Sequence, residues 1–142
     1  MTSYLSKIDS ALRAWSAHDL DTYLQLYDSN VTVFGLTPDP TPLDFQGMRG
    51  VYEMIFAAFP DMTIERLSAI SEGDKVAVHF RVRGTQQGDF QGIPATGRAV
   101  TANGMTILRF REGKVVERWN NFDYVSLMQQ LGVIPEAAPA AG

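Results

Sequence analysis

The spacing of apolar residues changes near residue 61, and this change constrains the fold more than any other feature of the sequence. Upstream, Ile8, Leu12 and Trp15 recur every three or four positions, which is the spacing of an amphipathic helix. Downstream, apolar and polar residues alternate, as in "KVAVHFRVRGT" at 75–85, which is typical of a strand with one buried face. Helices first and consecutive strands afterwards predict an α+β domain.

The same patterns predict the individual elements. The turns "EGD" at 72–74 and "REGK" at 111–114 join neighbouring strands as hairpins, so we expect a curved antiparallel sheet. We expect the helices to cover one face of this sheet and to leave a cone-shaped cavity, a common place for a small-molecule site. Helices are expected at 4–16, from Asp19, at 48–59 and at 124–131, and strands at 31–35, 62–71, 75–85, 98–110 and 115–123.

The bulk properties narrow the class of protein. The 142 residues have the size of one domain, which we place at 1–134, followed by a disordered tail at 135–142 that has little to bury. The net charge is −4 without a basic run, so we expect no nucleic-acid partner. No apolar run approaches the roughly 18 residues that span a membrane. The chain has no cysteine and no signal-peptide pattern, so we expect a cytoplasmic protein.

Three segments in a fixed order resemble one known family. They are "FPDMTIE" at 59–65, "EGDKVAVHFRVRGTQQGDFQGIPATGRAV" at 72–100 and "FREGKVVERWNNFD" at 110–123. Together they closely resemble the SnoaL-like polyketide cyclases, in the nuclear-transport-factor-2-like and ketosteroid-isomerase-like superfamily. The resemblance runs from about Asp19 to Leu131, and "GIPATG" is its most specific piece.

This resemblance implies a cone-shaped α+β barrel, a homodimer formed through the outer face of the sheet, and no cofactor. It implies a small apolar or aromatic carbonyl substrate, such as a polyketide ester that closes a ring by an intramolecular aldol reaction. A pocket aspartate acts as general acid/base in such cyclases, and the matching position here is Asp123. Trp119, in the same segment, would line the pocket.

Two interpretations of Asp123 remain open from the residues themselves. Strand alternation puts it on one face with Asn121 and Trp119; in an apolar pocket, burial would raise its pKa and make it a usable proton shuttle. Alternatively, Asp123 caps the helix expected at 124–131, since aspartate is a favoured N-cap residue. A capping carboxylate accepts backbone N–H groups, which lowers its pKa and weakens it as a base.

Further residues are candidates for substrate contact. His79 is an acid–base group, but it alternates with an apolar row and so is expected to point away from the helices. Asn103 would stabilise an enolate oxygen if its face of the strand is the inner one, which the pattern leaves open. The aromatic residues expected to form the apolar wall are Tyr27, Phe34, Tyr52 and Phe56.

Other chemistries compete with a cyclase. An isomerase, a dehydratase or an epoxide hydrolase could use the same fold, and a non-catalytic module could hold a hydrophobic ligand in the cone. The two histidines, His18 and His79, are too far apart to form a recognisable metal-ligand spacing, so we expect no metal.

Overall fold

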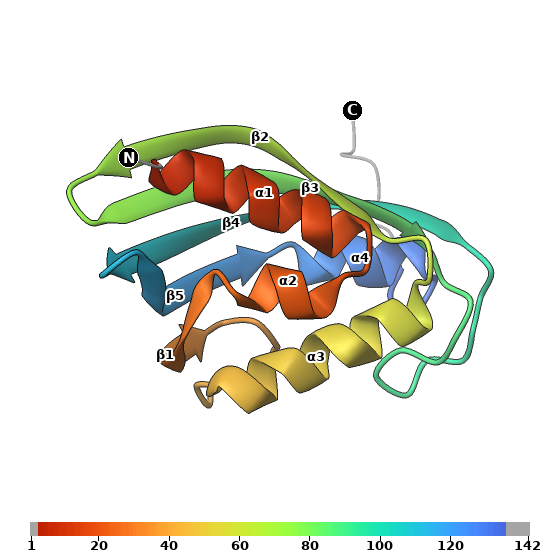
Figure 1. The fold of residues 1–142 in the computed structure, drawn as a ribbon. Helices are drawn as coiled ribbons and strands as arrows, with labels where there is room; N and C mark the ends of the chain where they lie inside the picture. Colours follow the sequence, from red (N-terminus) through yellow and green to blue (C-terminus); the bar gives the residue numbers. More distant parts are fainter. Residues whose placement is uncertain (1–2, 136–142) are drawn as a thin grey trace.

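The computed structural model describes residues 3–135 of the chain (Figure 1). It contains a curved five-stranded sheet, one face of which is covered by three helices, α1 (Tyr4–Ser16), α2 (Leu20–Leu24) and α3 (Phe45–Ala58). A short helix, α4 (Tyr124–Gln130), follows the last strand. This arrangement confirms the predicted α+β cone. Residues 136–142, most of the predicted disordered tail, lie outside the described residues.

Each helix begins where a side chain caps its first turn. Ser3 Oγ accepts the Ser6 N–H at 3.1 Å, and Asp19 Oδ1 accepts the Thr22 N–H at 3.3 Å, so the first two predicted starts are confirmed. Helix α3 begins three residues earlier than the pattern predicted, because Asp44 caps it through Gly47 N–H at 2.8 Å. No helix in residues 3–135 is long and apolar enough to cross a membrane.

The sheet differs from the prediction in one strand pair. Its order is β1-β5-β4-β3-β2, and β1 runs parallel to β5 while all other neighbours are antiparallel. Hairpin turns reveal the pairing of consecutive strands only. The strand β1 follows two helices in the chain and lies at the edge of the sheet beside β5, so no turn in the sequence indicated this pairing. The strands are β1 (Tyr27–Phe34), β2 (Thr63–Glu72), β3 (Lys75–Thr85), β4 (Ala99–Arg111) and β5 (Lys114–Phe122).

The inner face of the sheet is formed by the even-numbered residues of β3 and β4. Val78 and Phe80 on β3 are buried there, as predicted, and Thr106 and Leu108 on β4 join them. Gly104 is also on this face, and it marks close packing rather than a bulge: a Cβ atom there would lie 2.5 Å from Phe80 Cζ. The core therefore lies between this face and the helices.

Candidate active site

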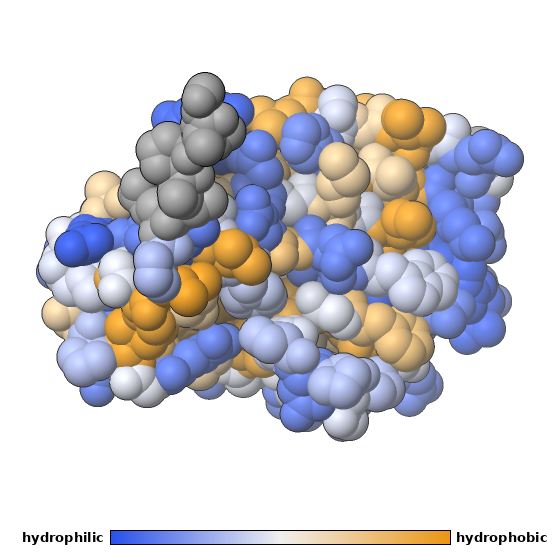
Figure 2. Space-filling model, turned by 180° about the vertical axis from the view of Figure 1, so that it is seen from behind, coloured by the Kyte–Doolittle hydropathy of each residue, from blue (hydrophilic) through white to orange (hydrophobic). Residues whose placement is uncertain are grey.

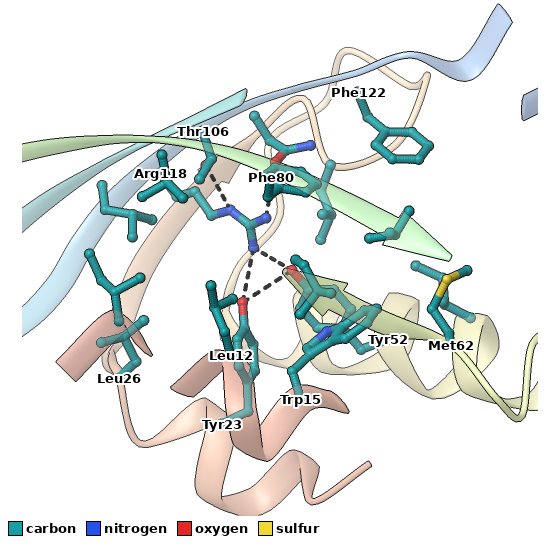
Figure 3. Close-up of a pocket in the computed structure, with 18 of the residues that line it drawn as sticks. Leu12, Trp15, Tyr23, Leu26, Tyr52, Met62, Phe80, Thr106, Arg118 and Phe122 are labelled. Carbon is teal, nitrogen blue, oxygen red and sulfur yellow. Dashed lines mark hydrogen bonds between the residues drawn. The ribbon is translucent and has the colours of Figure 1, made fainter. Parts of the chain in front are cut away.

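A cavity of about 100 Å³ lies between the inner face of the sheet and the helices (Figure 3). Its wall is mostly apolar, with Leu12 and Trp15 from α1, Ile55 from α3 and Phe80 from β3 among its members. A single water needs only ~10–15 Å³ of such space, so the cavity has room for several waters or for a small organic group. An apolar cavity with a few converging polar groups is the usual form of a small-molecule site.

The polar groups of the cavity converge on Arg118, from the inner face of β5. Its Nε donates to Thr106 Oγ1 at 3.1 Å, and its Nη2 donates to Asn120 Oδ1 at 3.0 Å. Its Nη1 faces the hydroxyls of three tyrosines, Tyr52 most closely, then Tyr27 at 3.2 Å and Tyr23 at 3.4 Å. Figure 3 shows the guanidinium pointing from the sheet toward the helices that carry Tyr23 and Tyr52.

Arg118 carries a buried positive charge without a negative partner. Its side chain is only 5% exposed, and no carboxylate in residues 3–135 lies within 4.0 Å of its guanidinium. Burying an unpaired charge is costly, and arginine cannot escape that cost by losing its proton. The hydroxyl dipoles replace part of the lost hydration. Such an arrangement is typical of a functional site rather than of a stabilising core.

Two tyrosines beside Arg118, Tyr23 and Tyr27, remain neutral near neutral pH. Burial raises the pKa of Tyr27 to about 12 although Arg118 lowers it, and burial likewise raises the pKa of Tyr124 to about 12. Burial also raises the pKa of Tyr23 well above its usual value. Burial lowers the pKa of Arg118. The interactions with the three tyrosine oxygens outweigh this effect, so the pKa is raised above its usual value. The hydroxyls of Tyr23 and Tyr27 therefore face the cation as neutral groups.

The structure brings only part of the predicted site together. Tyr27 and Tyr52 line the cavity and contact Arg118. Phe56 is half-buried beside the cavity wall, where its ring stacks on His18 with centroids 4.2 Å apart, and Phe34 is half-buried against Trp119. Neither phenylalanine is a lining residue.

The structure corrects the prediction of which β5 residues face the cavity. Trp119 and Asn121 point to the outer face of the sheet, as do their β4 neighbours, while Arg118 and Asn120 point into the cavity. The reason is a bulge at Val116: Phe110 pairs with Val115 but Arg109 pairs with Glu117, so β5 contains one extra residue. An extra residue exchanges the two faces of a strand, which simple alternation cannot reveal.

The other polar candidates also lie outside the cavity. Asn103 is exposed on the outer face of β4, and His79 is half-buried on the outer face of β3, opposite Met105. The prediction for His79 from strand alternation agrees with this position. Among the residues described, no group of three or more histidines, aspartates or glutamates could hold a metal ion.

Asp123 occupies the capping position of α4. Its side chain is exposed, and its Oδ1 accepts the Ser126 N–H at 3.0 Å. Its neighbours in sequence, Phe122 and Tyr124, both line the cavity, whereas Asp123 does not. The geometry therefore favours the capping interpretation, and the acid–base role of Asp123 stays a prediction.

Sequence reasoning missed the residues that form the polar cluster. Neither Arg118 nor Tyr23 was among the predicted site residues. One signal was available in the sequence. Arg118 lies in the middle of a strand that was predicted to pack into the sheet, and an arginine that is buried there needs polar partners. The hydroxyl partners themselves come from positions up to 95 residues away, which no local pattern connects.

The fold is an α+β cone of the nuclear-transport-factor-2-like type with a cavity inside it. The sequence profile of the SnoaL-like polyketide cyclases matches residues 8–131. The chain therefore belongs to the SnoaL-like polyketide cyclase family. No curated protein matches it.

Solved structures agree with this assignment. AclR from Streptomyces galilaeus, a proposed hydroxylase, is 28% identical with a TM-score of 0.87, over 95% of this chain and 84% of AclR. IdmH from Streptomyces antibioticus, a proposed polyketide cyclase, is 32% identical with a TM-score of 0.80, over 92% of this chain and 99% of IdmH. A SnoaL-like polyketide cyclase from Agrobacterium tumefaciens is 23% identical with a TM-score of 0.77, over 93% of this chain and 100% of that one, and it supports the fold alone.

If Arg118 serves a ligand rather than the fold, removing its charge should not destabilise the protein. We expect Arg118→Met to change the free energy of unfolding by no more than about 1.5 kcal/mol, because the removal of an unpaired buried charge offsets the hydrogen bonds that Thr106 and Asn120 lose. Phe110→Ala, which empties a well-packed position stacked on Tyr4, should lower it by about 3–5 kcal/mol. Urea unfolding measures both. A loss for Arg118→Met as large as that for Phe110→Ala would make Arg118 a structural residue.

Proposed function

We propose that this protein is a small-molecule enzyme that closes a ring in a carbonyl-activated substrate by an intramolecular aldol reaction. The proposal rests on one observation: the donors around Arg118 converge inside an otherwise apolar cavity. Family membership supports the same class of reaction. The substrate is a small apolar or aromatic carbonyl compound, because the rest of the cavity wall offers mainly apolar contacts.

The cluster suits the charge that develops in an aldol reaction. Loss of a proton from the carbon beside a carbonyl places negative charge on the carbonyl oxygen, and the Arg118 guanidinium stabilises that charge strongly where water is excluded. The enolate carbon then attacks the second carbonyl, and the new alkoxide must gain a proton. A neutral tyrosine hydroxyl such as that of Tyr27 can supply it, since an alkoxide is a stronger base than a phenolate.

The mechanism also needs a base that removes the carbon-bound proton. Among the described residues that line the cavity there is no carboxylate or imidazole. Asp123 is the described carboxylate that has a lining residue on each side in sequence, Phe122 and Tyr124, and it is our candidate for this base in competition with solvent. Its hydrogen bond to Ser126 N–H opposes the role, because capping stabilises the carboxylate.

Other reactions of the fold remain rivals. An isomerase or a dehydratase would use the same enolate stabilisation, so only product analysis separates them from a cyclase. AclR is a proposed hydroxylase and IdmH a proposed polyketide cyclase, so one fold is associated with more than one reaction. A non-catalytic binding module would keep its affinity without any turnover.

The decisive experiment is turnover of aryl β-keto esters that can close a ring. We expect Arg118→Met to lower kcat by about a hundredfold to a thousandfold, because a preorganised oxyanion donor is lost. Arg111→Met, which removes the same charge from an exposed position at the end of β4, should have no effect. Formation of the cyclised product is followed by chromatography and mass spectrometry.

The same assay tests Asp123. In Asp123→Asn the cap is retained, because asparagine is an equally good N-cap residue, so any change in turnover reports on proton transfer. A collapse of kcat would assign the base to Asp123, and an unchanged kcat would assign it to solvent. Unchanged turnover in Arg118→Met, or no cyclised product from any ester, would contradict the proposed function.

We further propose that the protein is a homodimer that buries the outer face of the sheet. Figure 2 shows this side of the molecule, where apolar side chains are interspersed with polar ones. Ile107 on β4 is paired with Ala77 on β3 and Trp119 on β5, and these are paired in turn with Ile70 and Phe34. One apolar row therefore crosses all five strands, with Ile70 74% and Ile107 41% exposed. A cytoplasmic location likewise stays a prediction.

Sedimentation equilibrium at micromolar concentration tests the dimer. We expect the dimer mass for the protein as it is and the monomer mass for Ile107→Lys, because a charge in the middle of the apolar row would be desolvated in the interface. Gln46→Lys adds the same charge at an exposed position of α3 and should remain dimeric. A monomer mass for the unaltered protein would refute the proposal.

A further inference from the structure

The polar cluster in the cavity leaves some hydrogen-bond donors without an acceptor. A guanidinium has five N–H bonds and no acceptor. Within residues 3–135, Arg118 Nη2 has one acceptor, Asn120 Oδ1, for its two N–H bonds. The three tyrosine hydroxyls make two contacts with one another, Tyr23 to Tyr27 at 2.6 Å and Tyr23 to Tyr52 at 3.3 Å. Each contact uses one proton, so at least one O–H bond remains for a ligand.

The cavity also carries a positive charge that no negative charge balances. Arg118 is the only charged side chain among the described residues of the lining, and its nearest neighbours are neutral hydroxyls and an amide. A neutral ligand would leave this charge unpaired. A ligand that brings one negative charge and an acceptor oxygen satisfies both the charge and the surplus donors.

The remainder of the wall indicates which kind of anion fits. It consists mainly of aliphatic and aromatic side chains, including Trp15, Phe80 and Phe122, which cannot replace the water around a compact ion. A carboxylate or a phosphate holds its charge on a small, strongly hydrated group. An enolate conjugated with a second carbonyl spreads its charge over a flat, weakly hydrated system, which matches the weakly hydrated guanidinium.

We propose that the cavity selects its ligand in anionic form, as the conjugated enolate of a 1,3-dicarbonyl compound or a hydroxyquinone. This inference rests on the site of the proposed function, but it concerns binding alone. It places the negative charge on the substrate before any reaction. Ionisation of the substrate in water, followed by selection of the enolate, would then remove the need for a base inside the cavity.

Isothermal titration calorimetry at neutral pH tests this selection with three probes of one ring size. They are 2-hydroxy-1,4-naphthoquinone, which is ionised; 1,4-naphthoquinone, which cannot ionise; and 2-naphthoate, a carboxylate. The chain has no cysteine that could react with the quinones. We expect the hydroxyquinone anion to bind about tenfold to a hundredfold more tightly than the neutral quinone, because a hydrogen-bonded charge pair is gained.

The variants identify the residue responsible. Arg118→Met should abolish the preference for the anion, and Arg118→Lys, which keeps the charge with fewer donors, should retain part of it. Arg111→Met should behave like the unaltered protein. Equal affinity for the two quinones, a preference that survives Arg118→Met, tighter binding of 2-naphthoate, or binding of no probe would each overturn the inference. If the preference holds but no ester is cyclised, the inference stands and the proposed function fails.

Discussion

The guanidinium of Arg118, buried among hydroxyl groups without a carboxylate, is the interaction around which the site is built. Its partners come from five elements: Tyr23 from α2, Tyr27 from β1, Tyr52 from α3, Thr106 from β4, and Asn120 from β5 itself. The cone holds these elements at fixed positions around one charge. Helices α2 and α3 and strand β1 thus do more than complete the fold, because they supply hydroxyl dipoles that make the buried charge tolerable.

Such a charge contributes little to folding and much to chemistry. A core of the same shape built from apolar side chains would be as stable or more stable, so the retention of Arg118 points to a ligand. Inside the cavity its electrostatic effect on an oxyanion is far greater than it would be in water. The mostly apolar wall therefore has two roles, binding the carbon skeleton of a ligand and strengthening the one cation that meets its oxygen atoms.

The sequence predicted those features that depend on local physics. The helix starts near residues 4 and 19, the single buried face of β3 and the hairpins of the sheet follow from periodicity and turn chemistry. The site was predicted poorly because it depends on one bulge and on distant pairing. The extra residue at Val116 exchanges the faces of β5, and no local signal brings the tyrosines together. The resemblance identified the family correctly, whereas the role carried over to Asp123 remains open.

The most direct test of the central claim is a crystal structure of the protein with 2-hydroxy-1,4-naphthoquinone. If Arg118 awaits an oxyanion, an oxygen of the ligand will lie within about 3.2 Å of its Nη2, with a tyrosine hydroxyl donating to the same oxygen or its neighbour. The ring will then lie against the apolar wall. A ligand bound with its oxygens toward Asp123 and with no contact to Arg118 would contradict this account.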